Sequence, residues 1–354
     1  MSFVYSHPFT GLANGLNTMQ GGGAIGGWVE LGRTTLGGTS DNISVSSLSD
    51  KRYYMVLGNT FASGIKRQTV RLNSDTGSNY AYRFNQNGTG EGIGTSKTFG
   101  IAHGLNNTVP DFTVSYCSNL STKEKLGISH SIDQSTASAS NAPVRGEYVW
   151  KWTNTTDPID EVTIHNPESG DFASGSEVVV LGWDPSDTHT NNFWQELASA
   201  NGDGTADFDT GTFTAKKYIW IQAFIKRSSD SSNTLFRVGN STIDTGSNYS
   251  WRKSSDGGAD STGTSQSSIV SRTGGGTDNT EFYNIFIVNN SSNEKLIISH
   301  HVNRNSSGAG SAPLRSEIVG KWTNTSNQIN IVGFNSGGAN TLSATSIVKV
   351  WGAD

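Results

Sequence analysis

Two short stretches of this 354-residue chain carry an acidic motif with well-defined chemistry. Asp-Thr-Gly-Ser begins at Asp75 and again at Asp244, and Asn-Tyr follows it both times. Two carboxylates held at such turns can share one proton and activate water for peptide hydrolysis. The pair of motifs therefore raises an aspartic protease as a candidate function.

The surroundings of both motifs argue against this chemistry. The aspartic-protease turn follows a buried apolar strand, whereas Asp75 follows Leu-Asn-Ser, and the Gly-rich segment after it contains no tyrosine-bearing flap. We interpret the motif instead as a β-turn made by the Asp side chain and the glycine, with Tyr80 or Tyr249 starting the next strand. We therefore expect no catalytic residues and no enzyme, and keep the protease as a remote alternative.

The histidines form no metal-binding pattern in the sequence. His130 and His300 both end an Ile-Ser-His stretch, without the Cys or His-x-His spacing of metal sites. We interpret them as strand-end residues that hydrogen-bond a neighbouring loop. We expect no metal and no cofactor. Cys117 is the only cysteine, so an intramolecular disulfide is impossible.

Aromatic and charged residues at matching positions could form a sugar-binding surface if they are exposed. Arg145 and Glu147 lie two residues apart, as do Arg315 and Glu317, so each pair shares one face of a strand. The candidate binding residues are Tyr80, Tyr249, Trp152, Trp322, Arg145 and Arg315. The other interpretation is a charged cross-strand ladder beside Trp residues that belong to a core.

Internal repetition is the dominant feature of the chain. EKLGISH at 124–130 returns as EKLIISH at 294–300, and APVRGEYVWKWTNTT at 142–156 returns as APLRSEIVGKWTNTS at 312–326, both shifted by 170 residues. Self-similarity on this scale predicts two copies of one domain.

The repeats also define the domain boundaries. We expect copy 1 at residues 28–184, a linker at 185–193 and copy 2 at 194–354, and the short polar linker indicates limited hinge motion. Residues 1–27 have no counterpart before copy 2 and contain seven glycines but no Asp, Glu, Lys or Arg. We interpret them as an arm that packs against a neighbouring subunit. Its apolar contact residues are Phe3, Tyr5, Phe9, Leu12 and Leu16.

The elements that must position these residues are strands. Apolar residues alternate or run together over four to nine positions, as in YYMVLGNTF and YIWIQAFI, between Gly-, Asn- and Ser-rich turns. Aromatic residues make up 10% and the net charge is only -5, which argues against disorder. We predict an all-β fold of two tandem homologous antiparallel β-sandwich (jelly-roll-like) domains, with eight to ten strands each and a Gly-rich N-terminal arm.

Charge and hydropathy argue against two kinds of partner. Nucleic-acid binding needs a basic surface, but both copies are weakly acidic and the arm is uncharged. No apolar run approaches the ~18 residues of a membrane span. The first 20 residues lack the basic and apolar regions of a signal peptide. We expect no nucleic acid, no membrane and no signal peptide.

The repeated blocks resemble structural proteins encoded by viruses of aquatic microbes. They are Trp-Val-Glu-Leu-Gly, Asp-Thr-Gly-Ser-Asn-Tyr, Glu-Lys-Leu-x-Ile-Ser-His and Lys-Trp-Thr-Asn-Thr. The resemblance implies a capsid, head-decoration or fibre/tail protein, located in the virion after assembly in the host cytoplasm. Its partners would be further copies of itself, as a homo-oligomer, and other virion proteins, with a host surface glycan as a further option. The alternative is a pair of lectin-like carbohydrate- or surface-binding modules.

Overall fold

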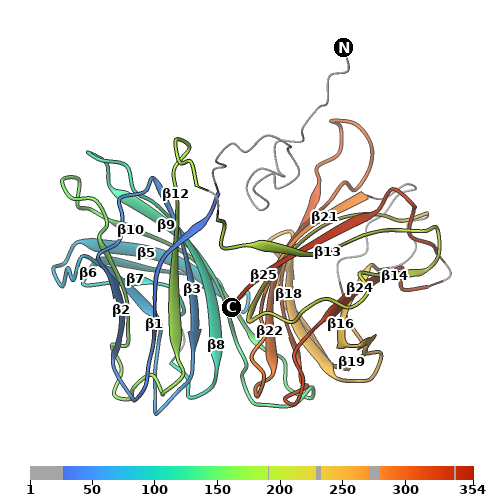
Figure 1. Ribbon diagram of the computed structural model, residues 1–354, viewed down its shortest axis with the longest axis horizontal. Helices are drawn as coiled ribbons and strands as arrows, with labels where there is room; N and C mark the ends of the chain where they lie inside the picture. Colours follow the sequence, from blue (N-terminus) through green and yellow to red (C-terminus); the bar gives the residue numbers. More distant parts are fainter. Residues whose placement is uncertain (1–26, 105, 190, 229–232, 271–279, 339) are drawn as a thin grey trace.

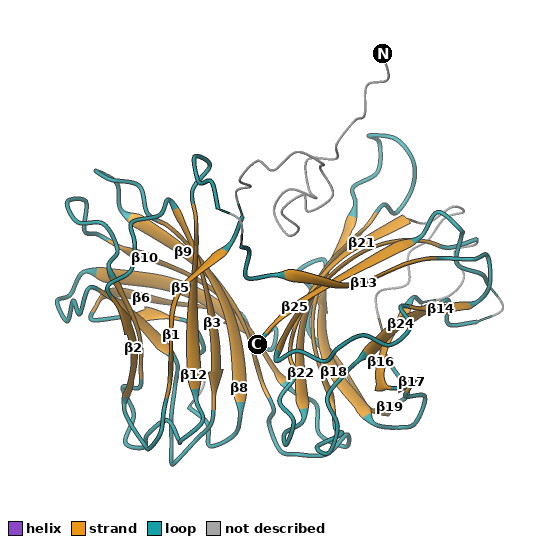
Figure 2. Ribbon diagram, viewed as in Figure 1, coloured by secondary structure: helices purple, strands orange, loops and turns teal. Residues whose placement is uncertain are grey.

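The computed structural model describes residues 27–354 except 105, 190, 229–232, 271–279 and 339. The described residues form strands and turns and no helix, as Figure 2 shows, so none of them builds a helix that could cross a membrane. The all-β class and the two tandem antiparallel β-sandwiches are confirmed. The arm residues Phe3, Tyr5, Phe9, Leu12 and Leu16 lie outside the described residues, so their role stays a prediction.

Copy 1 contains an eight-stranded and a four-stranded antiparallel sheet. The larger has the order β1-β12-β3-β8-β9-β10-β5-β6 and the smaller the order β2-β11-β4-β7. The strands are β1 (Val29–Thr35), β2 (Asn42–Ser46), β3 (Tyr53–Thr60), β4 (Thr69–Leu72), β5 (Tyr80–Gln86), β6 (Glu91–Lys97), β7 (Gly100–Ile101), β8 (Asp111–Ser118), β9 (Lys125–Asp133), β10 (Val144–Trp152), β11 (Glu161–His165) and β12 (Glu177–Trp183).

Copy 2 repeats this topology. Its eight-stranded sheet has the order β13-β25-β15-β21-β22-β23-β18-β19, which matches copy 1 strand for strand, and its smaller sheet has the order β14-β24-β16-β17 with β20 also paired to β16. The strands are β13 (Gln195–Asn201), β14 (Asp207–Asp209), β15 (Tyr218–Lys226), β16 (Leu235–Asn240), β17 (Thr242–Ile243), β18 (Tyr249–Ser255), β19 (Ser261–Gln266), β20 (Ile269–Val270), β21 (Thr280–Val288), β22 (Lys295–Asn303), β23 (Leu314–Trp322), β24 (Ile331–Asn335) and β25 (Ile347–Ala353). Each copy exceeds the predicted eight to ten strands, because strands of two to five residues, such as β7, β4 and β17, carry too little alternation to be seen in the sequence.

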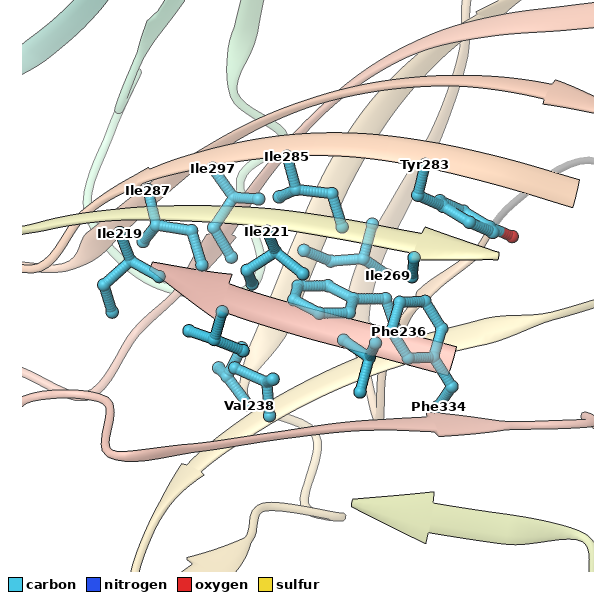
Figure 3. Close-up of a cluster of buried hydrophobic side chains, with 14 of the residues drawn as sticks. Ile219, Ile221, Phe236, Val238, Ile269, Tyr283, Ile285, Ile287, Ile297 and Phe334 are labelled. Atoms are coloured by element: carbon cyan, nitrogen blue, oxygen red, sulfur yellow. The ribbon is translucent and has the colours of Figure 1, made fainter. Parts of the chain in front are cut away.

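Each sandwich encloses its own apolar core. In β15, Ile219, Ile221, Ala223 and Ile225 are all fully buried, because every second residue of the strand points to the smaller sheet. Figure 3 shows Ile219 and Ile221 against side chains of β16, β20, β21 and β24. Each such buried side chain stabilises the sandwich by roughly 1.5–3 kcal/mol.

A third apolar cluster lies between the two sandwiches. Each eight-stranded sheet contributes the face that points away from its own sandwich core. The two sheets lie side by side at the centre of Figure 1. Copy 1 contributes Met55, Leu57, Phe112, Val114, Ile132, Val179 and Leu181, and copy 2 contributes Tyr218, Trp220, Phe286, Val288, Leu296, Ile298, Val319 and Trp351. We call this contact the seam. The sheets therefore stack in four layers, with the smaller sheets outermost.

The seam corrects the prediction of a hinge at residues 185–193. A large apolar contact between domains holds them in one arrangement, because opening it would expose the buried side chains to water. Phe193 and Trp194, where the linker enters copy 2, are themselves buried in the seam. Polar contacts add to it, including Lys217 Nζ to Glu177 Oε1 at 2.9 Å and a reciprocal amide pair between Asn59 and Asn290 at 3.1 Å.

Candidate functional site

The two Asp-Thr-Gly-Ser motifs form equivalent turns with the same side-chain hydrogen bonds, one in each sandwich. Asp75 Oδ1 accepts from the Gly77 amide at 2.7 Å, and its Oδ2 accepts from Asn79 Nδ2 at 2.9 Å and from Trp152 Nε1 at 2.6 Å. Asp244 makes the same three bonds, the one from Trp322 Nε1 being 2.7 Å long. The motif therefore closes a turn and anchors a core tryptophan.

These bonds account for the carboxylates without a proton-sharing pair. Burial alone would raise the pKa of Asp75, but the hydrogen bonds from Trp152, Asn79 and Gly77 outweigh burial and lower it. The pKa of Asp244 is lowered in the same way. Each carboxylate interacts with its own tryptophan, in a separate core, and not with the other carboxylate. The geometry gives the aspartic-protease alternative no support.

We expect Asp75→Ala to destabilise copy 1 by about 1–3 kcal/mol, because it leaves buried Trp152 Nε1 without its acceptor. Asp244→Ala should have the same effect on copy 2. Urea unfolding followed by tryptophan fluorescence measures both. A pepstatin-type inhibitor should not bind, and saturable binding at acidic pH that Asp75→Asn abolishes would instead restore the protease hypothesis.

The predicted sugar-stacking aromatics are not on the surface. Tyr80, Tyr249, Trp152 and Trp322 are at most 2% exposed, and they pack inside the two sandwich cores. The Tyr80 hydroxyl bonds the backbone of Leu72. The prediction that these four residues form a binding surface is wrong, because alternation cannot tell the inward face of a strand from an exposed one. Arg145 and Arg315, by contrast, both line an open groove.

The groove runs along the seam and has a volume of about 660 Å3. It arises because copy 2 covers only part of the outer face of the large sheet of copy 1. One cross-strand row starts with Val179, Leu57 and Val114, which are buried in the seam, and continues with His130 and Glu147, which are partly exposed. Strands β5, β6, β9 and β10 of copy 1, with β22, β23 and the turn after β18 of copy 2, line the groove.

His130, Glu147 and His300 converge where the groove meets the seam. His130 and Glu147 are directly opposed on β9 and β10, so their side chains share one face of the sheet. His300 reaches them from β22 of copy 2: its Nε2 lies 3.4 Å from Glu147 Oε1, and the two imidazole centroids are 4.1 Å apart. His130 Nδ1 also contacts Glu147 Oε2. The interpretation of both histidines as strand-end residues bonded to a loop is wrong, because β9 and β22 continue three residues beyond them.

Arginines surround this group. The Arg145 side chain is 3% exposed and forms two bonds to Asp260 of copy 2, Nη2 to Oδ1 at 2.9 Å and Nε to Oδ2 at 3.2 Å. Its Nη1 lies 3.5 Å from Glu147 Oε1. Arg315, the counterpart of Arg145, has a side chain that is 63% exposed and pairs with Glu317 at 3.1 Å. Twinned positions thus play different roles: Arg145 joins the sandwiches and Arg315 faces the groove.

The charged groups at this site shift the pKa values of Glu147 and His130. Burial would raise the pKa of Glu147, but the neighbouring His130 and His300 hold it well below its usual value. Burial would lower the pKa of His130, but the Glu147 carboxylate outweighs burial and raises it. The group therefore stabilises a carboxylate that has two imidazoles within reach.

The sequence indicates the members of this site but not that they come together. The matching positions of His130 and His300 were visible as a repeat, and so was the Arg-x-Glu spacing. Asp260 gave no signal, since it precedes β19 in a Gly- and Ser-rich turn. Nothing in the sequence indicated that the two copies meet through the faces carrying these residues.

Comparisons with known proteins give no family. No family model matches the chain, and no curated protein matches it either. Among solved structures, domains LG4-5 of the mouse laminin alpha1 chain align over 91% of this chain and 88% of that one, at 11% identity and a TM-score of 0.20. Neisserial surface protein A aligns over 81% of this chain and 99% of that one, at 8% identity and a TM-score of 0.14. Alignments at these TM-scores support no statement about function.

Proposed function

We propose that the chain is a virion structural protein that acts by self-assembly and protein-protein contacts, without catalysis. One observation carries the assembly part of the proposal. Four apolar side chains, Ile347, Phe224, Phe282 and Val302, are each 37–40% exposed on adjacent strands of copy 2. They are direct cross-strand partners along β25, β15, β21 and β22, so they form one continuous row. We call it the apolar row.

The position of the apolar row indicates what covers it. The row lies on the outer face of the large sheet of copy 2, the same face that forms the seam. In copy 1 the corresponding row contains Phe112 and Ile132, and these are buried against copy 2. The fold thus already buries this face against another sandwich of its own kind. We infer that a second copy of the chain covers the apolar row in the assembled particle, since exposed contiguous apolar surface marks interaction sites.

The double substitution Phe224→Ser and Phe282→Ser should weaken self-association by roughly tenfold or more, because central interface aromatics each contribute about 1–3 kcal/mol. Sedimentation velocity and electron microscopy at matched concentrations measure the assembled fraction. Ile65→Ser is the matched control, because Ile65 is a 45% exposed apolar residue outside the row. An unchanged particle size in the double variant would contradict the proposal, as would a wild-type chain that stays monomeric at high concentration.

The second candidate, a carbohydrate- or surface-binding protein, is favoured by the groove. Its wall combines charged side chains with exposed apolar ones: Ile128 and Val149 line it beside Arg83, in one cross-strand row over β9, β10 and β5. Such a mixed surface suits a ligand with both hydroxyls and apolar ring faces. Saturable glycan binding that Arg315→Ala abolishes, in a chain that forms no particles, would favour this candidate over assembly.

A further inference from the structure

The group of His130, Glu147 and His300 combines donor atoms that divalent transition metals use. One potential ligand atom from each of His130, Glu147 and His300, an imidazole nitrogen or a carboxylate oxygen, lies within 4.8 Å of the other two. Two imidazoles and one carboxylate are a recurrent ligand set for zinc and for iron(II). The sequence predicts no metal here, because it has no Cys or His-x-His spacing. The two histidines are 170 residues apart in the chain and become neighbours only through the seam.

The three side chains are accessible from the groove. His130 and Glu147 are each 23% exposed and His300 is 28% exposed. They belong to the middle of long strands, so their backbones are fixed by pairing on both sides. A fixed backbone with partly open side chains gives an ion both preorganised ligands and an entry path, which is what a binding site needs.

The surrounding charges favour a cation. Arg145 and Arg315 bring two positive charges, whereas Asp260, Glu317 and Glu147 bring three negative ones. Asp260 takes both bonds of the Arg145 fork and Glu317 pairs with Arg315, so the arginines are largely neutralised. A metal ion binds the neutral form of an imidazole and displaces any proton on it. With both imidazoles neutral, Glu147 is the excess negative charge, and a divalent cation then takes the place of the imidazolium charge beside this partly buried carboxylate.

We propose that His130, Glu147 and His300 bind one divalent first-row transition metal ion, with Zn²⁺ as the reference ion, and that this ion joins the two sandwiches across the seam. Two ligands come from copy 1 and the third from copy 2, so binding requires the closed arrangement of the sandwiches. The inference goes beyond the proposed assembly function and does not depend on it, since the site lies in the groove and involves no residue of the apolar row.

The test uses the full-length chain after treatment with EDTA. Titration with ZnCl2 in a calorimeter should give one site per chain, and Zn²⁺ should raise the midpoint of thermal unfolding. CoCl2 should produce the visible absorption of cobalt(II) bound by nitrogen and oxygen. His300→Asn and Glu147→Gln should each weaken Zn²⁺ binding by about 100-fold or more, because loss of a direct ligand costs at least as much as loss of an outer-shell partner.

His165→Ala is the matched control, because this partly exposed imidazole lies on β11, outside the groove. Burial and Arg71 lower the pKa of His165 to about 4, so it is a neutral histidine at pH 7 that could bind metal adventitiously. The proposal predicts that His165→Ala binds Zn²⁺ like the wild type. Three results would each overturn it: no Zn²⁺ or Co²⁺ binding by the wild type, unchanged binding by both His300→Asn and Glu147→Gln, or loss of the site only in His165→Ala. Circular dichroism of the apo variants separates loss of a ligand from loss of the fold.

Discussion

Replacing Lys66 by Met is expected to destabilise copy 1 by about 3–5 kcal/mol at pH 7, because it leaves a buried carboxylate without its counter-ion. The Lys66 and Asp111 side chains are both fully buried, and Nζ lies 2.6 Å from Oδ2. Asp111 also accepts from Gln68 Nε2 at 2.6 Å and from the Thr60 hydroxyl. These neutral donors remain in the variant, but they carry no charge to offset burial of the anion.

The destabilisation by Lys66→Met should depend on pH in a defined direction. Burial would raise the pKa of Asp111, but in the wild type the charges of Lys66 and His103 and the hydrogen bonds outweigh it and lower the pKa. The wild-type carboxylate therefore contributes stability above its unfolded pKa, and this contribution is lost as the pH falls through the lower folded pKa. Without Lys66 we expect burial to raise the folded pKa of Asp111 above its unfolded pKa, so the variant should lose stability as the pH increases. Urea unfolding should show a smaller difference between variant and wild type at pH 4.5 than at pH 7.

Two further variants separate the ion pair from its surroundings. Lys66→Met combined with Asp111→Asn should recover much of the lost stability, because no unpaired buried charge remains. Lys97→Met removes an exposed lysine on β6 and should change stability by less than about 0.5 kcal/mol. A double variant as unstable as Lys66→Met alone would mean that packing, and not charge, sets the effect.

The sequence predicted the strands because their physics is local. A central strand such as β15 reads YIWIQAFIK, and its alternation and β-branched residues leave no other assignment. The repeated blocks predicted that β22 and β23 copy β9 and β10, and the strand orders agree. Repetition also placed the equivalent turns at Asp75 and Asp244, which make the same side-chain hydrogen bonds in the structure.

The site could not be predicted because it depends on how one sandwich packs on the other. In β10, Arg145 and Glu147 share one face, whereas Trp150 and Trp152 belong to the apolar core. Nothing local distinguishes a tryptophan that stacks on a ligand from one that fills a core, so Trp152 was assigned wrongly. The contact of His130 with His300 needs the seam as well, and the seam follows from the joint apolar surface of two sheets and not from any single strand.

Replacing the seam residue Trp220 by Ala is the second change that we expect to have a large effect on stability. Trp220 is 6% exposed, stacks on Phe286 with ring centroids 5.5 Å apart, and contacts Trp194 and Trp351 at 5.7 and 5.6 Å. Its Nε1 donates to Asn284 Oδ1 at 2.6 Å. Trp220→Ala should cost about 3–5 kcal/mol, since it opens a cavity in a cluster of large rings.

Trp220→Ala should also change the number of transitions in which the chain unfolds. Because the seam buries apolar residues of both sandwiches, we expect wild-type unfolding in one cooperative transition, and a cavity in the seam removes the free energy that couples the two halves. Differential scanning calorimetry should therefore resolve two transitions in Trp220→Ala.

Trp322→Ala is the matched control, because Trp322 fills the core of copy 2 without belonging to the seam cluster. Trp322→Ala should destabilise copy 2 by a similar amount and leave the seam intact, so we expect it to unfold in one transition at a lower temperature. If both variants unfolded in a single transition, the seam would not be the contact that couples the sandwiches. If the wild type itself unfolded in two, the sandwiches would be independent, and a metal ion bridging His130 and His300 should then merge their transitions.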